Sequence, residues 1–174
     1  MIGDRWGVTD AEVARRYPCD DLAGTDRPAL EAWRGVDVAA PPDVLWPWVG
    51  QVRVAPYSYD WVDNLGRRSP RRLLDLPEPV VGEPFTRALG RDQGEVLHVE
   101  PGVGLTGRIL GALLSYVVAP GASPATSRLL LKIVMPRGRA VARVVSVGDL
   151  VMARKQLLTL AALAAASAAE ADRG

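Results

Sequence analysis

His98 is the only histidine of the 174-residue chain, and it is the side chain best suited to acid–base chemistry near neutral pH. Glu100 lies two residues further along the same predicted strand and could orient the imidazole. A histidine that points from a strand into solvent is the simpler interpretation, so we assign no catalytic residue. One histidine and one cysteine, Cys19, cannot supply the usual ligands of zinc, and we predict no metal site.

Two further chemical motifs can be tested by spacing alone. No serine stands in a G-x-S-x-G sequence, which argues against an esterase nucleophile elbow. Gly102, Gly104 and Gly107 have the spacing of a dinucleotide-binding fingerprint. They lie among predicted antiparallel strands, however, and lack the helix that must follow such a turn. We therefore predict no cofactor.

Several side chains could instead contact a ligand. Tyr57, Tyr59 and Trp61 are either the aromatic wall of a cavity or the residues that hold a short helix against a sheet. Met152 and Gln156 lie one helical turn apart at the start of a long predicted helix. Methionine is an adaptable lining residue, and glutamine adds a polar group. Ordinary core and surface roles remain open for both.

A basic segment follows the aromatic cluster. Arg67, Arg68, Arg71 and Arg72 could bind phosphate or acidic lipid headgroups, or they could belong to a solvated loop. The role of residues 67–72 stays open at this point.

The pattern of apolar residues predicts the elements that position these side chains. Thr9 and Glu12 have capping-box spacing, so a short helix is expected at about 10–16, with a polar loop at 19–28. A strand is expected at 29–39 and helices at 44 onward and 57–65. The remaining predicted elements are strands at 84–89, 95–99, 104–110, 113–118 and 128–135, and a helix from Asp149 to about residue 169, with 139–147 ambiguous.

Composition restricts the class of protein. Twenty-one basic and 20 acidic residues give a net charge of +1, which argues against a dedicated nucleic-acid binder. One cysteine allows no intrachain disulfide. The first residues lack the apolar run of a secretory signal, and no charge-free stretch reads as a continuous membrane-spanning helix. We expect a cytoplasmic protein without an integral membrane segment.

The order of elements predicts an α+β fold. A long amphipathic helix must bury its apolar stripe, and an antiparallel sheet needs cover for one face. A curved sheet wrapped around the C-terminal helix, with two short helices after the first strand, satisfies both needs. This arrangement leaves room for a ligand cavity between helix and sheet. We expect an N-terminal extension with one short helix at 1–28 and a single domain at 29–174.

Several segments resemble bacterial SRPBCC proteins, which belong to the START-like, birch-pollen-allergen-like superfamily. The similar segments, in the same order, are 6–15, 18–22, 39–52 (AAPPDVLWPWVGQV), 57–65 (YSYDWVDNL), 127–129 and 148–158 (GDLVMARKQLL). The chain departs from the family where 64–83 is rich in arginine and where Tyr116 replaces a tryptophan. The resemblance implies the helix-grip fold for 29–174 and a hydrophobic or aromatic small-molecule ligand, with no catalytic residue to carry over.

Three functions therefore stay open. The first is binding or carriage of a small hydrophobic molecule, which the absence of an evident acid–base pair favours. The second is a polyketide cyclase or dehydrase that uses the same cavity, and the third is an interaction or regulatory module with a collapsed cavity. A monomer and a homodimer are both compatible with the sequence. The expected cavity residues are Tyr57, Tyr59, Trp61, Tyr116, Leu131, Met152 and Gln156.

Overall fold

The structure is a computed structural model of the chain, and it describes residues 4–25, 27–57, 69–88, 90–137 and 139–173. A six-stranded sheet has the order β1-β2-β8-β7-β6-β5, and β3 and β4 form a separate hairpin. The strands are β1 Arg5–Trp6, β2 Leu30–Val38, β3 Thr86–Ala88, β4 Arg91–Gln93, β5 Glu95–Glu100, β6 Gly104–Ile109, β7 Ala112–Pro120 and β8 Ser127–Met135. The helices are α1 Asp10–Ala14, α2 Pro18–Leu22, α3 Pro42–Gly50, the 3-10 turn η1 Gln51–Arg53 and α5 Arg139–Ala171.

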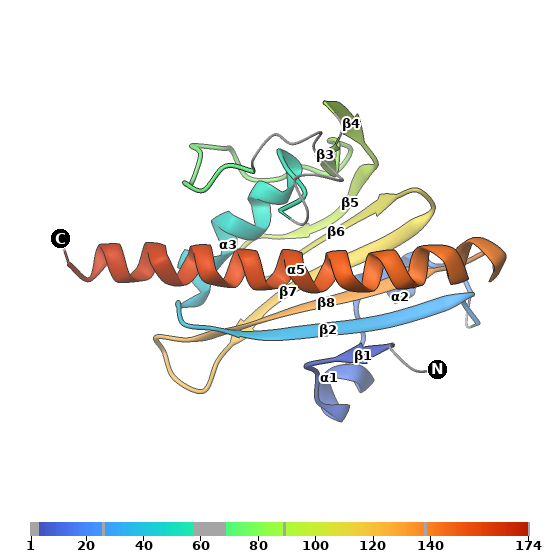
Figure 1. The fold of residues 1–174 in the computed structure, drawn as a ribbon, viewed down its shortest axis with the longest axis horizontal. Helices are drawn as coiled ribbons and strands as arrows, with labels where there is room; N and C mark the ends of the chain where they lie inside the picture. Colours follow the sequence, from blue (N-terminus) through green and yellow to red (C-terminus); the bar gives the residue numbers. More distant parts are fainter. Residues whose placement is uncertain (1–3, 26, 58–68, 89, 138, 174) are drawn as a thin grey trace.

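The long helix α5 crosses one face of the sheet, and α3 packs beside it on the same face (Figure 1). Helices α1 and α2 lie on the other side, where α2 contacts β7 and β8 (Figure 1). This is the helix-grip arrangement predicted from the order of elements, and the α+β fold class is confirmed. Within the described residues, no helix is long and apolar enough to cross a membrane.

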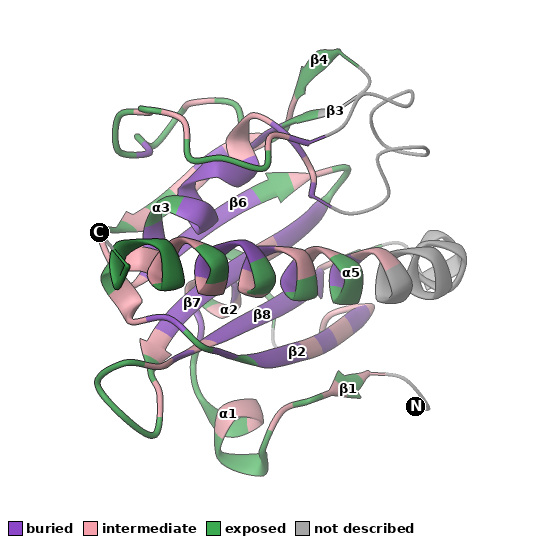
Figure 2. Cartoon of the chain, turned by 60° about the vertical axis from the view of Figure 1, so that its left-hand side comes forward, coloured by how far each residue is buried: buried purple, intermediate pink, exposed green. Residues whose placement is uncertain are grey.

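Two apolar clusters lie on opposite faces of the sheet because side chains alternate along each strand. The inner cluster, between the sheet and the helices α3 and α5, includes Tyr116, Leu131 and Leu157. The outer cluster lies between the sheet and α2 and includes Tyr17, Cys19 and Leu130. Strands β2, β7 and β8 are therefore buried along most of their length (Figure 2). Both faces of the sheet are covered there, so even the polar residues Ser115, Ser127 and Lys132 are buried.

Helix α5 begins ten residues before Asp149, where the sequence pattern placed its cap. The ambiguous segment 139–147 is helical, and Gly148 lies inside the helix. A single glycine costs a helix about 1 kcal/mol relative to alanine, which the packing of the long helix α5 against the sheet can offset. The glycine was therefore a poor marker of the helix start.

The N-terminal segment contains more regular structure than predicted. The polar stretch 19–28 was expected to be a loop, yet α2 occupies Pro18–Leu22. Proline is favoured in the first helical turn, and the Asp20 carboxylate accepts a hydrogen bond from the Tyr17 amide. Strand β1 is also present and pairs in parallel with β2. The capping box of Thr9 and Glu12 is confirmed at the start of α1.

The turn predicted at 90–94 contains strand β4, which pairs with β3. After β2 the chain forms α3, which confirms the helix expected from residue 44, and then the short turn η1. Most of the predicted helix at 57–65 lies outside the described residues.

Candidate functional site

Tyr116 and Leu131 face the same layer because strand register places them opposite each other on β7 and β8. Both side chains are almost fully buried in the inner cluster. The intervening residues of these strands, such as Val117 and Leu130, face the outer cluster. Two of the predicted cavity residues are therefore neighbours on the face of the sheet that α5 covers.

Gln156 connects helix α5 to this face of the sheet. The Tyr116 hydroxyl donates a hydrogen bond to Gln156 Oε1 over 2.5 Å. Gln156 Nε2 donates to the Pro56 carbonyl oxygen, also over 2.5 Å. Met152 lies one turn earlier on α5, and both it and Gln156 are half-buried. The Tyr116–Gln156–Pro56 chain thus links a strand, the long helix and the segment after η1.

Tyr57 is buried next to this chain, directly after Pro56. Its ring meets Trp48 edge-on, with the ring centroids 6.3 Å apart, and its hydroxyl accepts a hydrogen bond from Gln51 Nε2. Gln51 also donates to the Arg72 carbonyl and accepts from the Leu74 amide, so one buried amide holds two loop segments. Tyr59 and Trp61, the other two predicted aromatic residues, lie outside the described residues.

Phe85 is an inner-layer aromatic residue that sequence reasoning missed. Its ring is buried, and its centroid lies 6.2 Å from that of Tyr116. Gly107 on β6 makes this position possible, because a Cβ atom there would lie 2.0 Å from Phe85 Cδ2. The glycine that matched a nucleotide-binding spacing therefore serves packing, and its occurrence inside a strand was the available signal of close approach.

His98 is exposed, and strand β5 contains a bulge between Val96 and His98. An even alternation along this strand would place Leu97 and Val99 together on the inner side and Val96 outside. The bulge breaks that alternation: Val96 and Val99 join the inner cluster, whereas Leu97 joins the outer one. The outward position of His98 is nevertheless as predicted.

A group of charged side chains occupies the outer face. Lys132 is 4% exposed and pairs with Asp20 and with Glu31, whose Oε1 lies 3.0 Å from Lys132 Nζ. Burial acts to lower the pKa of Lys132, but the hydrogen bonds that its ammonium donates to the two carboxylates outweigh burial, and the pKa is raised. The ammonium also lies 4.8 Å from the ring centroid of Trp33. These contacts fasten α2 and β2 to β8.

A second ionic contact fastens α1. Arg128 Nε donates to Glu12 Oε1 over 2.7 Å, and this hydrogen bond lowers the pKa of the Glu12 carboxyl. Arg128 also pairs with Asp37 on β2. Arg128 thereby holds α1 to β8 and also joins β8 to β2.

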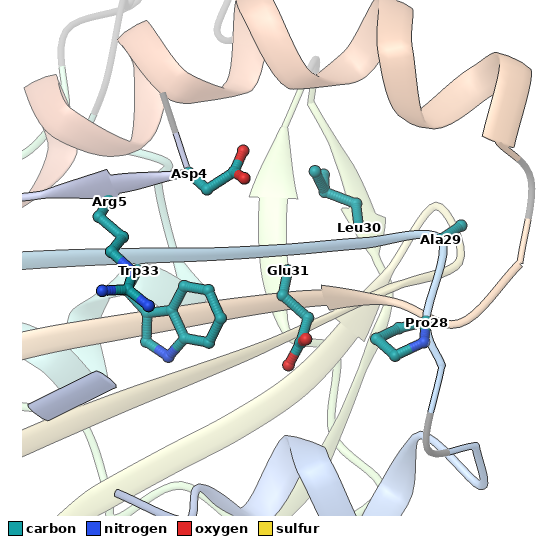
Figure 3. A pocket seen from close by; sticks show the side chains of 7 residues that line it. All are labelled: Asp4, Arg5, Pro28, Ala29, Leu30, Glu31 and Trp33. Atoms are coloured by element: carbon teal, nitrogen blue, oxygen red, sulfur yellow. The ribbon is translucent and has the colours of Figure 1, made fainter. Parts of the chain in front are cut away.

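A pocket of about 540 Å³ lies at the start of β2, and its lining includes Ala29 and Leu30 from the margin of the inner cluster. Figure 3 shows Leu30 on the opposite side of β2 from Glu31 and Trp33, so the pocket wraps around the sheet edge. Its charged groups are already engaged: Arg5 pairs with Asp10, and Glu31 pairs with Lys132. We therefore take the inner layer around Gln156 as the candidate site. Among the described residues, no three histidine, cysteine or acidic side chains are grouped so that they could hold a metal ion.

Comparison with known proteins gives fold-level similarity. No family model and no curated protein matches the sequence. Among solved structures, protein MLL2253 from Mesorhizobium loti is 18% identical, with a TM-score of 0.48, over 76% of this chain and 95% of its own. Protein CV1439 from Chromobacterium violaceum is 15% identical, with a TM-score of 0.48, over 78% and 97% of the two chains.

A solution structure of a Polyketide_cyc-like protein from Corynebacterium glutamicum is 16% identical, with a TM-score of 0.41, over 77% of this chain and 93% of its own. These identities and scores are low, and the assignment of the fold stands on the observed topology. The six-stranded sheet with α5 across its face has the helix-grip arrangement that the resemblance to SRPBCC proteins predicts, so the expected fold is confirmed.

Proposed function

We propose that the protein binds a small, largely apolar molecule between the inner face of the sheet and α5, beside Tyr116 and Gln156. The observation that carries this proposal is the Tyr116–Gln156–Pro56 hydrogen-bonded chain within an otherwise apolar layer. Ligand sites are commonly apolar surfaces with a few convergent polar groups. Phe85 and Leu131 supply apolar surface in the same layer, and the half-buried Met152 lies one turn before Gln156 on α5.

Carriage fits these groups better than catalysis. A phenol has a pKa near 10 in water, and a carboxamide does not titrate in the accessible range. Neither group exchanges protons readily at neutral pH, so the pair is suited to holding a ligand in one orientation. The resemblance to SRPBCC proteins supports the same class of ligand, hydrophobic or aromatic. The enzyme alternative would require a reacting group beside this pair.

Titration with N-phenyl-1-naphthylamine, a neutral apolar dye whose fluorescence rises on burial, tests the proposal. We expect saturable binding with one site per chain. Met152→Trp should weaken the dye at least about tenfold, because the larger ring fills space beside Gln156. The matched control is Leu158→Trp, since Leu158 lies on the outer face of α5 and is 43% exposed.

Non-saturable dye binding would contradict the proposal. Equal affinities for the two folded tryptophan variants and the wild type would also contradict it, because the site could not then lie beside Met152. Far-ultraviolet circular dichroism of both variants establishes that they are folded.

A further inference from the structure

The contacts of Gln156 fix which way its amide points. The Pro56 carbonyl oxygen can only accept a hydrogen bond, so the atom that faces it must be the amide nitrogen. The amide oxygen therefore faces Tyr116, and the Tyr116 hydroxyl must act as the donor. Both assignments follow from the partners. A reversed amide would place Gln156 Oε1 against the Pro56 carbonyl oxygen, and both atoms are acceptors.

The same contacts leave one donor available. A primary amide carries two N–H groups, and the contact with Pro56 uses one of them. Within the described part of the chain, Gln156 Nε2 has no second acceptor. Gln156 is half-buried, so this N–H can be reached, whereas the phenol to which the amide oxygen is bonded is only 2% exposed.

The ligand group that complements this donor is a neutral acceptor. The two residues hydrogen-bonded to Gln156 are a tyrosine and a proline, and neither provides a positive charge for an anionic group. Removing an unpaired carboxylate from water has a large cost in free energy. The desolvation of a neutral carbonyl oxygen costs much less, and one hydrogen bond offsets it. Tyr116 is hydrogen-bonded to the amide, and its ring packs against Phe85, so the groups nearest to this donor include aromatic rings that favour a flat ligand body.

We propose that the ligand is an aromatic or otherwise apolar molecule with a carbonyl oxygen, and that the second N–H of Gln156 selects for that oxygen. This inference rests on the proposed function, because it names the class of ligand that the inner layer takes. Gln156 is thus a specificity-determining residue, oriented by Tyr116 and Pro56.

Competition between two matched ligands tests the inference. The ligands 2-acetylnaphthalene and 2-ethylnaphthalene have similar size and differ by a carbonyl in place of a methylene. Each is titrated against the protein saturated with N-phenyl-1-naphthylamine. We expect the ketone to bind the wild type at least about fivefold more tightly than the hydrocarbon. Gln156→Met should remove this preference, and Tyr116→Phe should retain it in part, because the amide N–H remains.

A measurement on the wild type covers the case in which Gln156→Met does not fold. The side-chain amide resonances of Gln156 should shift on addition of 2-acetylnaphthalene and change little with 2-ethylnaphthalene. Equal affinities of the two ligands for the wild type, or equal amide shifts, would overturn the inference and leave apolar binding intact. Failure of the dye to bind saturably would overturn the proposed function as well, so the two failures are distinguishable.

Discussion

Cys19 has a buried thiol on the outer face of the sheet. Its side chain is fully buried under α2, its amide donates to Ser115 Oγ, and burial raises the pKa of the thiol to about 11. Burial likewise raises the pKa of the nearby Tyr17 to about 12. The reactive form of a cysteine is the thiolate, so this thiol is both shielded and protonated at neutral pH.

The raised pKa of Cys19 predicts a loss of stability in alkali. Its ordinary pKa is 9.0, so below pH 9 the thiol is protonated in both the folded and the unfolded chain. As the pH rises from 9 towards 11 the unfolded chain ionises first, and the free energy of unfolding falls by an amount on the order of 2 kcal/mol. Urea denaturation at pH 8 and pH 10.5 measures this change.

Cys19→Ala is the control for that prediction, and it should show a smaller fall between the same two pH values. The fall should not vanish, because the ordinary pKa of Tyr17 is 10.0 and burial raises it to about 12, so its contribution to stability begins to be lost as the pH passes 10. An identical pH dependence in the variant and the wild type would show that Cys19 is not the titrating group.

Helix α5 stabilises the fold through one face only. Leu157 and Leu160 are fully buried against the inner layer, whereas Leu158 is 43% exposed. Adjacent leucines of the same helix therefore have opposite surroundings. Trp48 on α3 donates a hydrogen bond to Ser167 Oγ, which adds a polar contact between the two helices that cover the sheet.

Substitution of adjacent leucines on α5 should have sharply different effects. Leu157→Asp places a carboxylate in an apolar layer without a partner and should reduce the free energy of unfolding by about 4 kcal/mol or prevent folding. Leu158→Asp should cost less than about 1 kcal/mol. Thermal unfolding followed by circular dichroism compares the two. Similar melting temperatures would contradict the proposed packing of α5.

The elements differ in how well sequence could predict them. Strands β7 and β8 and the buried stripe of α5 followed from apolar runs and helical spacing, and Tyr116, Leu131 and Gln156 were named from them. The bulge in β5, strand β1 and the position of Phe85 were not predictable locally. Each depends on a partner distant in sequence: Gly107 for Phe85, and β2 for β1. Local patterns specify which face of a strand or helix is apolar. Contacts with other segments determine features such as strand β1 and the position of Phe85.

At the scale of the whole molecule, the N-terminal segment completes a second core. We propose that residues 1–28 are an extension and 29–174 a domain. The extension supplies Tyr17 and Cys19 to the outer cluster, and its Asp20 pairs with the buried Lys132. It therefore covers apolar surface and balances a buried charge at the same time.

Deletion of residues 1–28 should strongly destabilise the remaining chain. The change exposes Leu113, Val117, Leu130 and Val134, and it leaves Glu31 as the acidic partner of Lys132 among the described residues. We expect a loss of at least about 3 kcal/mol in the free energy of unfolding. Urea denaturation of the shortened and full-length chains measures it. A shortened chain as stable as the full one would show that the outer cluster needs no cover.

The pairing of β2 with β8 has a consequence for how the chain is made. Leu30 pairs with Met135, so the centre of the sheet joins segments about a hundred residues apart. Closing so long a loop lowers the entropy of the chain before the contacts between the two strands can stabilise it. Such pairings therefore form slowly. On the ribosome, the edge of β2 that pairs with β8 must stay unpaired until β8 has emerged, and on the other edge only the two-residue strand β1 is available. A nascent chain of this protein is therefore open to aggregation or to chaperone capture for most of its synthesis.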